Sequence, residues 1–231
     1  MHIIISPSKT MRMTTNEYLT SLKPIDLDKT NQIITHLQQY SKKDLQQVML
    51  LSDKLIDEVY PIIQQFKDAK EGHAILSYRG FVFQKLAFST YTKSEYLYIE
   101  EHVRILDALY GFLNPSTLIK PYRLDFQMKL GLNLYQYWTI DEYLDEPIIN
   151  LASNEYHKLI KYKKTINISF LQCKKGQLKN VPTHTKQARG MMLNYMILNK
   201  IENIEDIRNF SEAGYTYVKD LSSAQELVFI R

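Results

Sequence analysis

Residues 1–10 of the chain read MHIIISPSKT. The apolar run from Met1 to Ile5, closed by Pro7, is typical of a buried β-strand whose carboxyl end turns into a loop. Directly after it, Ser6 and Lys9 supply a hydroxyl and an ammonium group beside free backbone N–H groups. Ligands in open α/β sheets bind outside the carboxyl ends of the strands. We therefore expect part of an anion site here, and a turn with a surface lysine is the alternative.

The rest of the chain predicts a mixed α/β (α+β) fold, with a mixed sheet flanked by helices in a single compact domain over residues 1–231. No internal repeat or linker interrupts it. Helical spacing predicts helices over residues 28–40, 42–51, 52–66, 94–110, 154–160 and 183–201, and one helical turn from Pro115. Strands are predicted over residues 73–77, 148–152, 165–173 and 177–181, with a closing hairpin of 215–219 and 227–230.

The composition is that of a globular protein, because 45% of the 231 residues are hydrophobic and 23% are charged. No apolar run of about 18 residues and no secretory leader is present, so we expect a cytoplasmic protein without a membrane segment. The single cysteine, Cys173, agrees with a reducing compartment. We interpret it as a buried small side chain rather than a reactive thiol.

The net charge of +4 is unevenly distributed. Residues 154–189 carry nine lysines and arginines against one acid, Glu155, so this segment carries +8 and the rest of the chain −4. The asymmetry favours a basic face for phosphate-rich partners, and a solvated lysine surface is the alternative.

Motifs for common chemistry are absent. The six histidines and one cysteine lack paired ligand spacing, so we expect no metal site and no cofactor. The sequences GxxxxGK[ST], GxGxxG and GxSxG do not occur. Glu155 is the one candidate general base, no nucleophile is evident, and a helix N-terminus is expected to keep Glu155 ionised.

A second group of candidate anion ligands follows the strand 148–152. Asn150 lies in that strand, and Ser153 is placed as the N-cap of the next helix, where anions commonly bind. Lys186 and Arg189 lie three residues apart on the predicted helix 183–201 and share a face. We predict that Lys9, Lys186, Arg189 and Arg123 converge with Ser6 on one concave site.

Several phrases, in the same order along the chain, resemble the YaaA family of peroxide-stress proteins. They are ISPSKT (5–10), SDKL (52–55), Tyr110-Gly111 with Pro115, PYRL (121–124), LYQYW (134–138), INLASNEY (149–156), ARG (188–190) and ELVF (226–229). The chain departs from the family pattern at Ser8, where alanine is common, and at Asn154, where aspartate is common.

The resemblance implies a mixed α/β fold with a positively charged cleft, DNA binding aided by a helix-hairpin-helix element, and a role in limiting free iron during peroxide stress. The matching element would be the helix ending at Tyr110, the hairpin from Gly111 to Asn114 and the turn from Pro115. Such an element offers unpaired N–H groups to a phosphate without reading base sequence. An αα-corner packed in the core is the alternative, and Leu113 replaces the usual second glycine of the hairpin.

Two functions are therefore expected. The first is non-enzymatic binding of the double-stranded DNA backbone through the hairpin element and the basic residues Lys158, Lys161, Lys163 and Lys164. The alternative is an enzyme acting on a nucleotide or another small phosphate-bearing molecule, with bases stacking on Tyr122, Tyr135 or Trp138. An open groove running toward Gly111 and Lys161 would favour the first, and a closed cavity with Glu155 near the anion site would favour the second.

Overall fold

The computed structural model describes residues 1–231, and its central strand is β1 (His2–Ile5), whose four residues are all buried. β1 pairs in parallel with β3 (Val103–Asp107) on one side and with β6 (Ile148–Asn150) on the other. Three isoleucines with β-branched side chains suit a strand that is covered on both faces. The predicted first strand is therefore confirmed, and it lies at the middle of the sheet.

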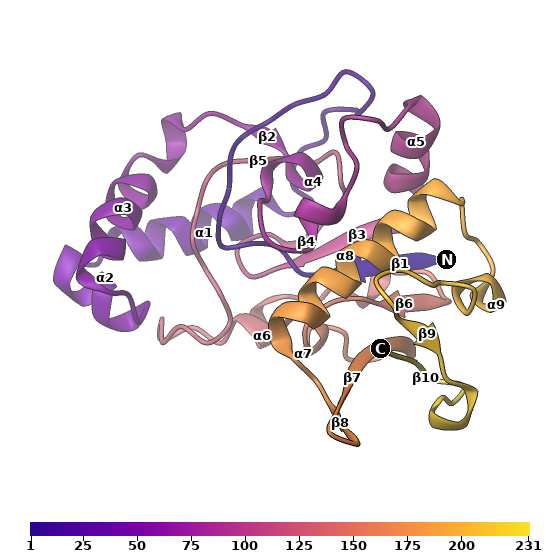
Figure 1. Cartoon of the computed structure of the whole chain (residues 1–231). Coiled ribbons are helices and arrows are strands. Elements are labelled where there is room, and N and C mark those ends of the chain that lie inside the picture. Colours follow the sequence, from indigo (N-terminus) through magenta and orange to yellow (C-terminus); the bar gives the residue numbers. More distant parts are fainter.

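The eight-stranded sheet has the order β4-β3-β1-β6-β7-β10-β9, with β8 paired to β7 (Figure 1). Strands β3, β1, β6, β7 and β10 run in parallel, whereas β4, β8 and β9 are antiparallel to their neighbours. The remaining strands are β4 (Gly111–Leu113), β7 (Thr165–Lys174), β8 (Gln177–Lys179), β9 (Thr216–Tyr217) and β10 (Glu226–Ile230). Because the chain adds β3 and β4 on one side of β1 and then continues with β6 on the other, the strand order reverses between β1 and β6. Such a reversal opens a crevice at the carboxyl ends of the two strands.

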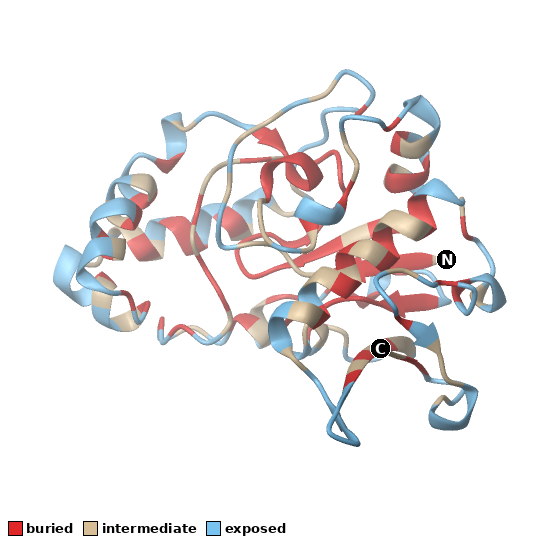
Figure 2. Cartoon of the chain, in the orientation of Figure 1, coloured by how far each residue is buried: buried red, intermediate tan, exposed pale blue.

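Helices flank the sheet, as predicted. The helices α1 (Leu27–Gln38), α2 (Lys42–Val48) and α3 (Asp53–Gln64) form a lobe to one side, while α8 (Pro182–Leu198) crosses in front of the sheet (Figure 1). The other helices are α4 (Ala74–Ser77), α5 (Lys93–His102), α6 (Leu134–Tyr137), α7 (Asn154–His157) and α9 (Ile204–Ile207). Sixty buried hydrophobic residues form one core cluster (Figure 2). No helix is both long and apolar enough to cross a membrane.

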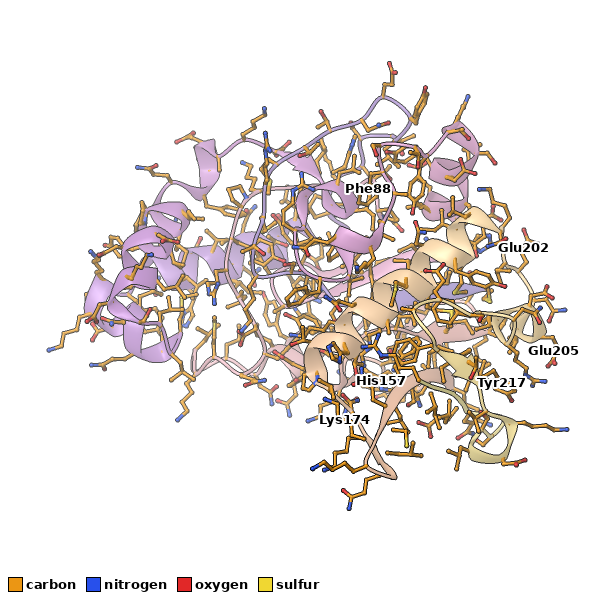
Figure 3. All side chains as sticks on the ribbon, in the orientation of Figure 1. Phe88, His157, Lys174, Glu202, Glu205 and Tyr217 are labelled. Carbon is orange, nitrogen blue, oxygen red and sulfur yellow. The ribbon has the colours of Figure 1, made fainter.

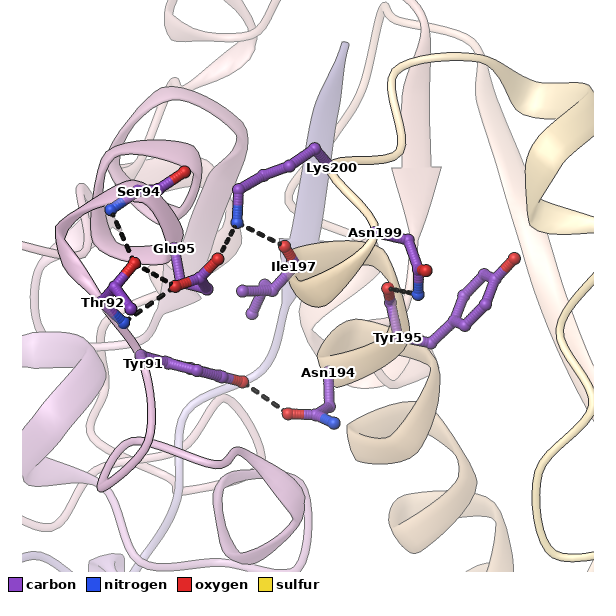
Figure 4. A network of polar contacts seen from close by, with 9 residues as sticks. All are labelled: Tyr91, Thr92, Ser94, Glu95, Asn194, Tyr195, Ile197, Asn199 and Lys200. Carbon is purple, nitrogen blue, oxygen red and sulfur yellow. Dashed lines mark hydrogen bonds and ion pairs between the residues drawn. The ribbon is translucent and has the colours of Figure 1, made fainter.

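The carboxyl-terminal half of α8 is fastened to the start of α5 (Figure 4). The Lys200 ammonium lies 2.5 Å from Glu95 Oε1, and the Tyr91 hydroxyl donates to Asn194 Oδ1 at 2.6 Å. Glu95 also closes a capping box with Thr92 at the start of α5. These contacts fix the end of α8 opposite to the one that carries Lys186 and Arg189.

The predicted helix-hairpin-helix element is wrong. Helix α5 ends at His102, and β3 begins at the next residue, so residues 103–107 form a strand rather than the last turns of a helix. Val103 and Ile105 are fully buried in the sheet, and pairing with β1 overrides the helical spacing. Gly111, at φ +68°, begins β4, which forms a β-hairpin with β3. Asn114 and Pro115 lie in the turn that follows, and no helix starts there.

Two further predictions are wrong. The sequence predicts a strand over residues 73–77, but β2 (Gly72–His73) pairs with β5 (Leu118–Ile119) and Ala74 starts the helical turn α4. Every residue from Ala74 to Ser77 is buried. The segment therefore has no alternation of buried and exposed side chains that would distinguish a strand from a helical turn. Cys173 is exposed near the end of β7, because the strand runs beyond the core there.

Candidate functional site

A cavity of about 610 Å³ lies at the carboxyl ends of β1 and β6, where the strand order reverses. Four segments supply its walls: the loop after β1, the segment from β6 into α7, the loop 80–83 and the first turns of α8. Five of the eight predicted anion ligands line it, together with the candidate base Glu155: Ser6, Lys9, Ser153, Lys186 and Arg189. The pairing of β1 with β6 in register brings the first two segments together.

Ser6 and Ser153 join the two strand ends. The Ser153 backbone N–H donates to Ser6 Oγ at 2.8 Å, and the Ser6 hydroxyl donates to Ser153 Oγ at 3.3 Å. Because Ile4 is in register with Asn150, the residues that follow the two strands emerge side by side. The two hydrogen bonds hold these strand ends together at the cavity.

Arg189 is the principal cation of the cavity. Its guanidinium makes no hydrogen bond and no ion pair with the protein, and its Nε is buried. Burial lowers the pKa of Arg189, although a guanidinium stays charged at neutral pH. A partly buried cation without a counter-charge is costly unless an anion compensates it. Arg189 is therefore an uncompensated positive charge at the wall of the cavity.

The neighbours of Arg189 on α8 bring the helix close to the loop 80–83. Ala188 is fully buried, and a Cβ at Gly190 would lie 2.3 Å from the Val82 carbonyl oxygen. Only a residue without a side chain allows this approach. Close contact of helix and loop thus sets the position of one cavity wall.

Lys9 and Lys186 contribute differently to the charge of the cavity. Lys9 Nζ lies 2.5 Å from Asp125 Oδ2, so a carboxylate compensates it. Asp125 is buried, and its Oδ1 accepts the Gln127 N–H at 3.2 Å. Lys186 is exposed and has no carboxylate partner. Lys186 and Arg189 are therefore the two uncompensated cations of the cavity.

Glu155 lies where α7 begins, at the edge of the cavity. Its Oε1 accepts the Phe126 N–H at 3.1 Å, and its Oε2 accepts from the Gln127 side-chain amide at 3.3 Å. Burial, and then the negative charge of Asp125, raise the pKa of Glu155, while the Phe126 N–H and Lys9 act against the rise. The helix N-terminus that was expected to keep Glu155 ionised is opposed here by burial and by a second carboxylate, and α7 has only four residues.

Three predicted ligands lie elsewhere. The Tyr122 hydroxyl donates to Asp107 Oδ2 in the core, 2.9 Å from the Tyr78 hydroxyl. Arg123 does not line the cavity, and its buried Nε has no partner. Asn150 lines an adjoining cavity instead.

The aromatic side chains expected to stack on a base are engaged within the protein. Tyr135 stacks on Phe126, with ring centroids 4.4 Å apart, and its hydroxyl donates to the Glu155 carbonyl at 2.9 Å. The Trp138 indole N–H donates to the Ala108 carbonyl at 3.0 Å, and its ring covers Gly111.

The lysines of residues 158–164 do not line the cavity, nor does Gly111. Lys161 Nζ donates to the Trp138 carbonyl at 3.1 Å. The backbone N–H groups of residues 161–163 donate to Asp141, and the Lys164 N–H donates to Glu146. Lys158, Lys161 and Lys164 are exposed to solvent, and Lys163 is half-buried.

A second basic surface projects from the body of the protein. The β7–β8 hairpin extends from the sheet, and all its residues from 173 to 180 are exposed (Figures 1 and 2). Lys174 lies on this hairpin (Figure 3), together with Lys175 and Lys179. The hairpin leads through Asn180, which lines the cavity, into α8.

Sequence reasoning missed Asp125 and the loop 80–83. Asp125 comes one residue after the phrase PYRL, and an acid beside a family motif was the available signal. No pattern in residues 80–83 marks them, because tertiary packing against α8 brings them to the site. No group of three or more His, Cys, Asp or Glu side chains is arranged to hold a metal ion.

The sheet with its reversed strand order defines an α/β protein with a cavity at the carboxyl ends of its central parallel strands. The family model described as "Peroxide stress protein YaaA" matches residues 1–221. The chain belongs to this family.

Curated relatives match over the full length. A UPF0246 protein of Acaryochloris marina is 36% identical over 251 residues, covering 100% of both chains. A UPF0246 protein of Agathobacter rectalis is 37% identical, covering 100% of this chain and 99% of the relative. A UPF0246 protein of Pediococcus pentosaceus is 36% identical, covering 100% of this chain and 98% of the relative.

Proposed function

We propose that this protein binds a small phosphate-bearing molecule in the cavity between β1 and β6. We further propose that it does so in the cytoplasm, and that this binding is its role in the response to peroxide. The observation that carries the proposal is Arg189, a guanidinium without any partner in the protein beside a cavity of about 610 Å³. Lys186 adds a second uncompensated charge, and Ser6 and Ser153 add hydroxyls. A planar guanidinium suits the bidentate binding of phosphate oxygens.

Glu155 gives this site a group that can exchange a proton with a ligand. Its raised pKa brings it closer to the range in which general bases work. The cavity includes Glu155 but neither Gly111 nor Lys161, which favours the small-molecule alternative over a groove that continues along the protein.

The test is calorimetric titration of inorganic phosphate into the wild type, Arg189→Met and Arg208→Met. Arg208 is a matched control, since it lies beside α9 and pairs with Glu205, away from the cavity. We expect the wild type and Arg208→Met to bind alike and Arg189→Met to bind at least tenfold more weakly. Equal binding by Arg189→Met would overturn the proposal.

A second candidate function is binding of the double-stranded DNA backbone by the β7–β8 hairpin. The exposed Lys174, Lys175 and Lys179 on a projecting hairpin favour it. Removing one lysine that neutralises a DNA phosphate should reduce the slope of log K against log salt by about 0.9. Changing Lys174 and Lys175 to Glu should therefore lower this slope, whereas the same change at Lys161, Lys163 and Lys164 should leave it unchanged. An unchanged slope in the hairpin variant would remove the hairpin from the interface.

The limitation of free iron is proposed as a consequence of ligand binding rather than a separate activity. Cells that carry only Arg189→Met should then show the free-iron level of cells without the protein after peroxide treatment, as measured by electron paramagnetic resonance. A wild-type level of free iron in these cells would show that the limitation of iron does not depend on ligand binding in the cavity.

A further inference from the structure

A second cavity, of about 310 Å³, adjoins the first and shares Asn154, Asn180, Thr185 and Arg189 with it. Arg189 therefore lies between two compartments. The second compartment extends along β7 to the start of β10, and polar side chains dominate its lining. The further residues that carry the argument are Asn150, Asn167, His157, Ser169 and Glu226.

Two asparagines of this second compartment are held with an amide donor left over. Asn150 Oδ1 accepts the Ala152 N–H at 2.9 Å, and its Nδ2 donates to Asn167 Oδ1 at 2.7 Å. This chain of bonds fixes Asn167 Oδ1 as an acceptor and leaves Asn167 Nδ2 without a partner. In the same way, Asn180 Oδ1 accepts the Thr185 hydroxyl at 2.9 Å, which leaves Asn180 Nδ2 without one.

The two compartments differ in net charge, because Glu226 balances the shared Arg189 in the second compartment, whereas Lys186 adds to Arg189 in the first. Lys186 and Arg189 are the uncompensated cations of the first compartment. Glu226 lines the second one, where its Oε1 accepts the Ser169 hydroxyl at 2.5 Å. A carboxylate repels a second anionic group but accepts hydrogen bonds from ligand hydroxyls. The amides and the carboxylate together suit a neutral group that both donates and accepts.

We propose that the ligand is a phosphate monoester of a sugar, with its phosphate at Arg189 in the first compartment and its sugar hydroxyls in the asparagine-lined second compartment. This inference rests on the proposed function, because it requires the phosphate to bind at Arg189. It adds that the phosphate is attached to a polyhydroxylated group, and that the ligand has no anionic group besides this phosphate. Free sugar phosphates and nucleoside monophosphates share this chemistry.

The experiment is calorimetric titration of the wild type with inorganic phosphate, ribose 5-phosphate, ribose 1,5-bisphosphate and a nucleoside 5′-monophosphate. We expect ribose 5-phosphate to bind at least tenfold more tightly than phosphate, and the bisphosphate more weakly than ribose 5-phosphate. A nucleoside monophosphate that binds more tightly than ribose 5-phosphate identifies a nucleotide as the source, and one that binds more weakly identifies a free sugar phosphate. Equal affinities of phosphate and ribose 5-phosphate would overturn the inference and leave the proposed function standing.

Variants separate the compartments. Asn167→Leu should bind ribose 5-phosphate about tenfold more weakly than the wild type and bind phosphate with unchanged affinity. Arg189→Met should lose affinity for both ligands. Asn154→Ala is the second variant, because the exposed Asn154 side chain makes no hydrogen bond in the protein and its removal should leave the fold intact. Since Asn154 lines both compartments, its readout is the ratio of the ribose 5-phosphate and phosphate affinities. Its expected loss for ribose 5-phosphate is about threefold. Asn209→Leu, beyond α9, is the control. If Asn167→Leu and Asn154→Ala both keep wild-type discrimination between the two ligands, the second compartment is not a sugar site.

Discussion

Lys9 and Asp125 lie 116 residues apart in the sequence, yet the Lys9 ammonium nitrogen is 2.5 Å from Asp125 Oδ2. The pair ties the loop after β1 to the segment that precedes α6. It also sets the charge of the cavity, since Asp125 cancels one lysine and raises the pKa of Glu155. The cavity is therefore less positive than its lysines and arginines alone would make it.

Replacing Asp125 by Asn should increase the affinity for phosphate. The change releases the Lys9 ammonium and removes a negative charge beside Glu155. Two unit charges about 4 Å apart interact by about 1 kcal/mol at the dielectric of water, so the affinity should rise on the order of fivefold. Asp57→Asn is the matched control, because Asp57 also pairs with a lysine, Lys42, at 2.5 Å but lies on α3. Titration of both variants with phosphate decides the matter, and a weaker or unchanged affinity in Asp125→Asn would contradict the expectation.

Replacing Arg189 by Met should stabilise the protein in the absence of ligand. Methionine keeps much of the apolar stem and removes a cation without a partner, so we expect the free energy of unfolding to rise by about 1 kcal/mol. In a chain of this size such a rise corresponds to about 2–4 °C in Tm. Urea denaturation without phosphate provides the measurement. A lower midpoint would show that the guanidinium contributes packing or a contact worth more than its desolvation.

Acid should weaken the fold partly through His2. Burial, and then the positive charge of Arg104, lower the pKa of His2 from 6.5 to about 4. The unfolded chain therefore binds a proton that the folded chain does not, and stability declines as the pH falls from about 6.5 to about 4. The decline attributable to this residue is about 3 kcal/mol. In His2→Gln, the free energy of unfolding should vary less with pH across this window, and a slope equal to that of the wild type would be the contrary result.

Gly190→Ala tests the contact of α8 with the loop 80–83. Helix propensity alone favours alanine over glycine by about 1 kcal/mol. The new Cβ would lie 2.3 Å from the Val82 carbonyl oxygen, so overpacking should prevail and destabilise the protein by about 1–3 kcal/mol. Phosphate binding should weaken as well, because the loop 80–83 forms a cavity wall. Gln187→Ala on the same helix is the control, and a stabilised Gly190→Ala would show that the loop gives way.

The sequence predicts the central strand β1 better than the boundary between α5 and β3. Ile3, Ile4 and Ile5 indicate β1 because a short apolar run before a proline has few other interpretations. The helix predicted from residue 94 extends too far because α5 passes into β3 at Val103 without any glycine or proline between them. Val103 and Leu106 satisfy helical spacing and lie in a strand, so periodicity alone cannot separate the two structures.

The candidate site shows the same limit. Ser6 and Ser153 could be placed together, since each follows a strand and parallel strands share an edge. Arg189 could be placed beside Lys186 because the two residues lie three apart on one predicted helix and share a face. Asp125 follows the phrase PYRL directly, but its pairing with Lys9 joins segments far apart in the sequence, and the loop 80–83 reaches the cavity only by packing against α8.

The parallel pairing of β1 has a cost during synthesis. Its partner residue Val103 lies 100 positions after Ile3, and Ile148 lies 146 positions after His2. At roughly 5–20 residues per second, the ribosome needs about 7–30 s to supply the second partner. Once the segment has left the ribosome, three consecutive isoleucines with strong β-propensity stay exposed on the nascent chain for the rest of that interval, and contacts between distant residues form slowly. We therefore expect the newly made chain to depend on a chaperone that shields residues 2–5 until β6 emerges, even though the finished sheet buries them completely.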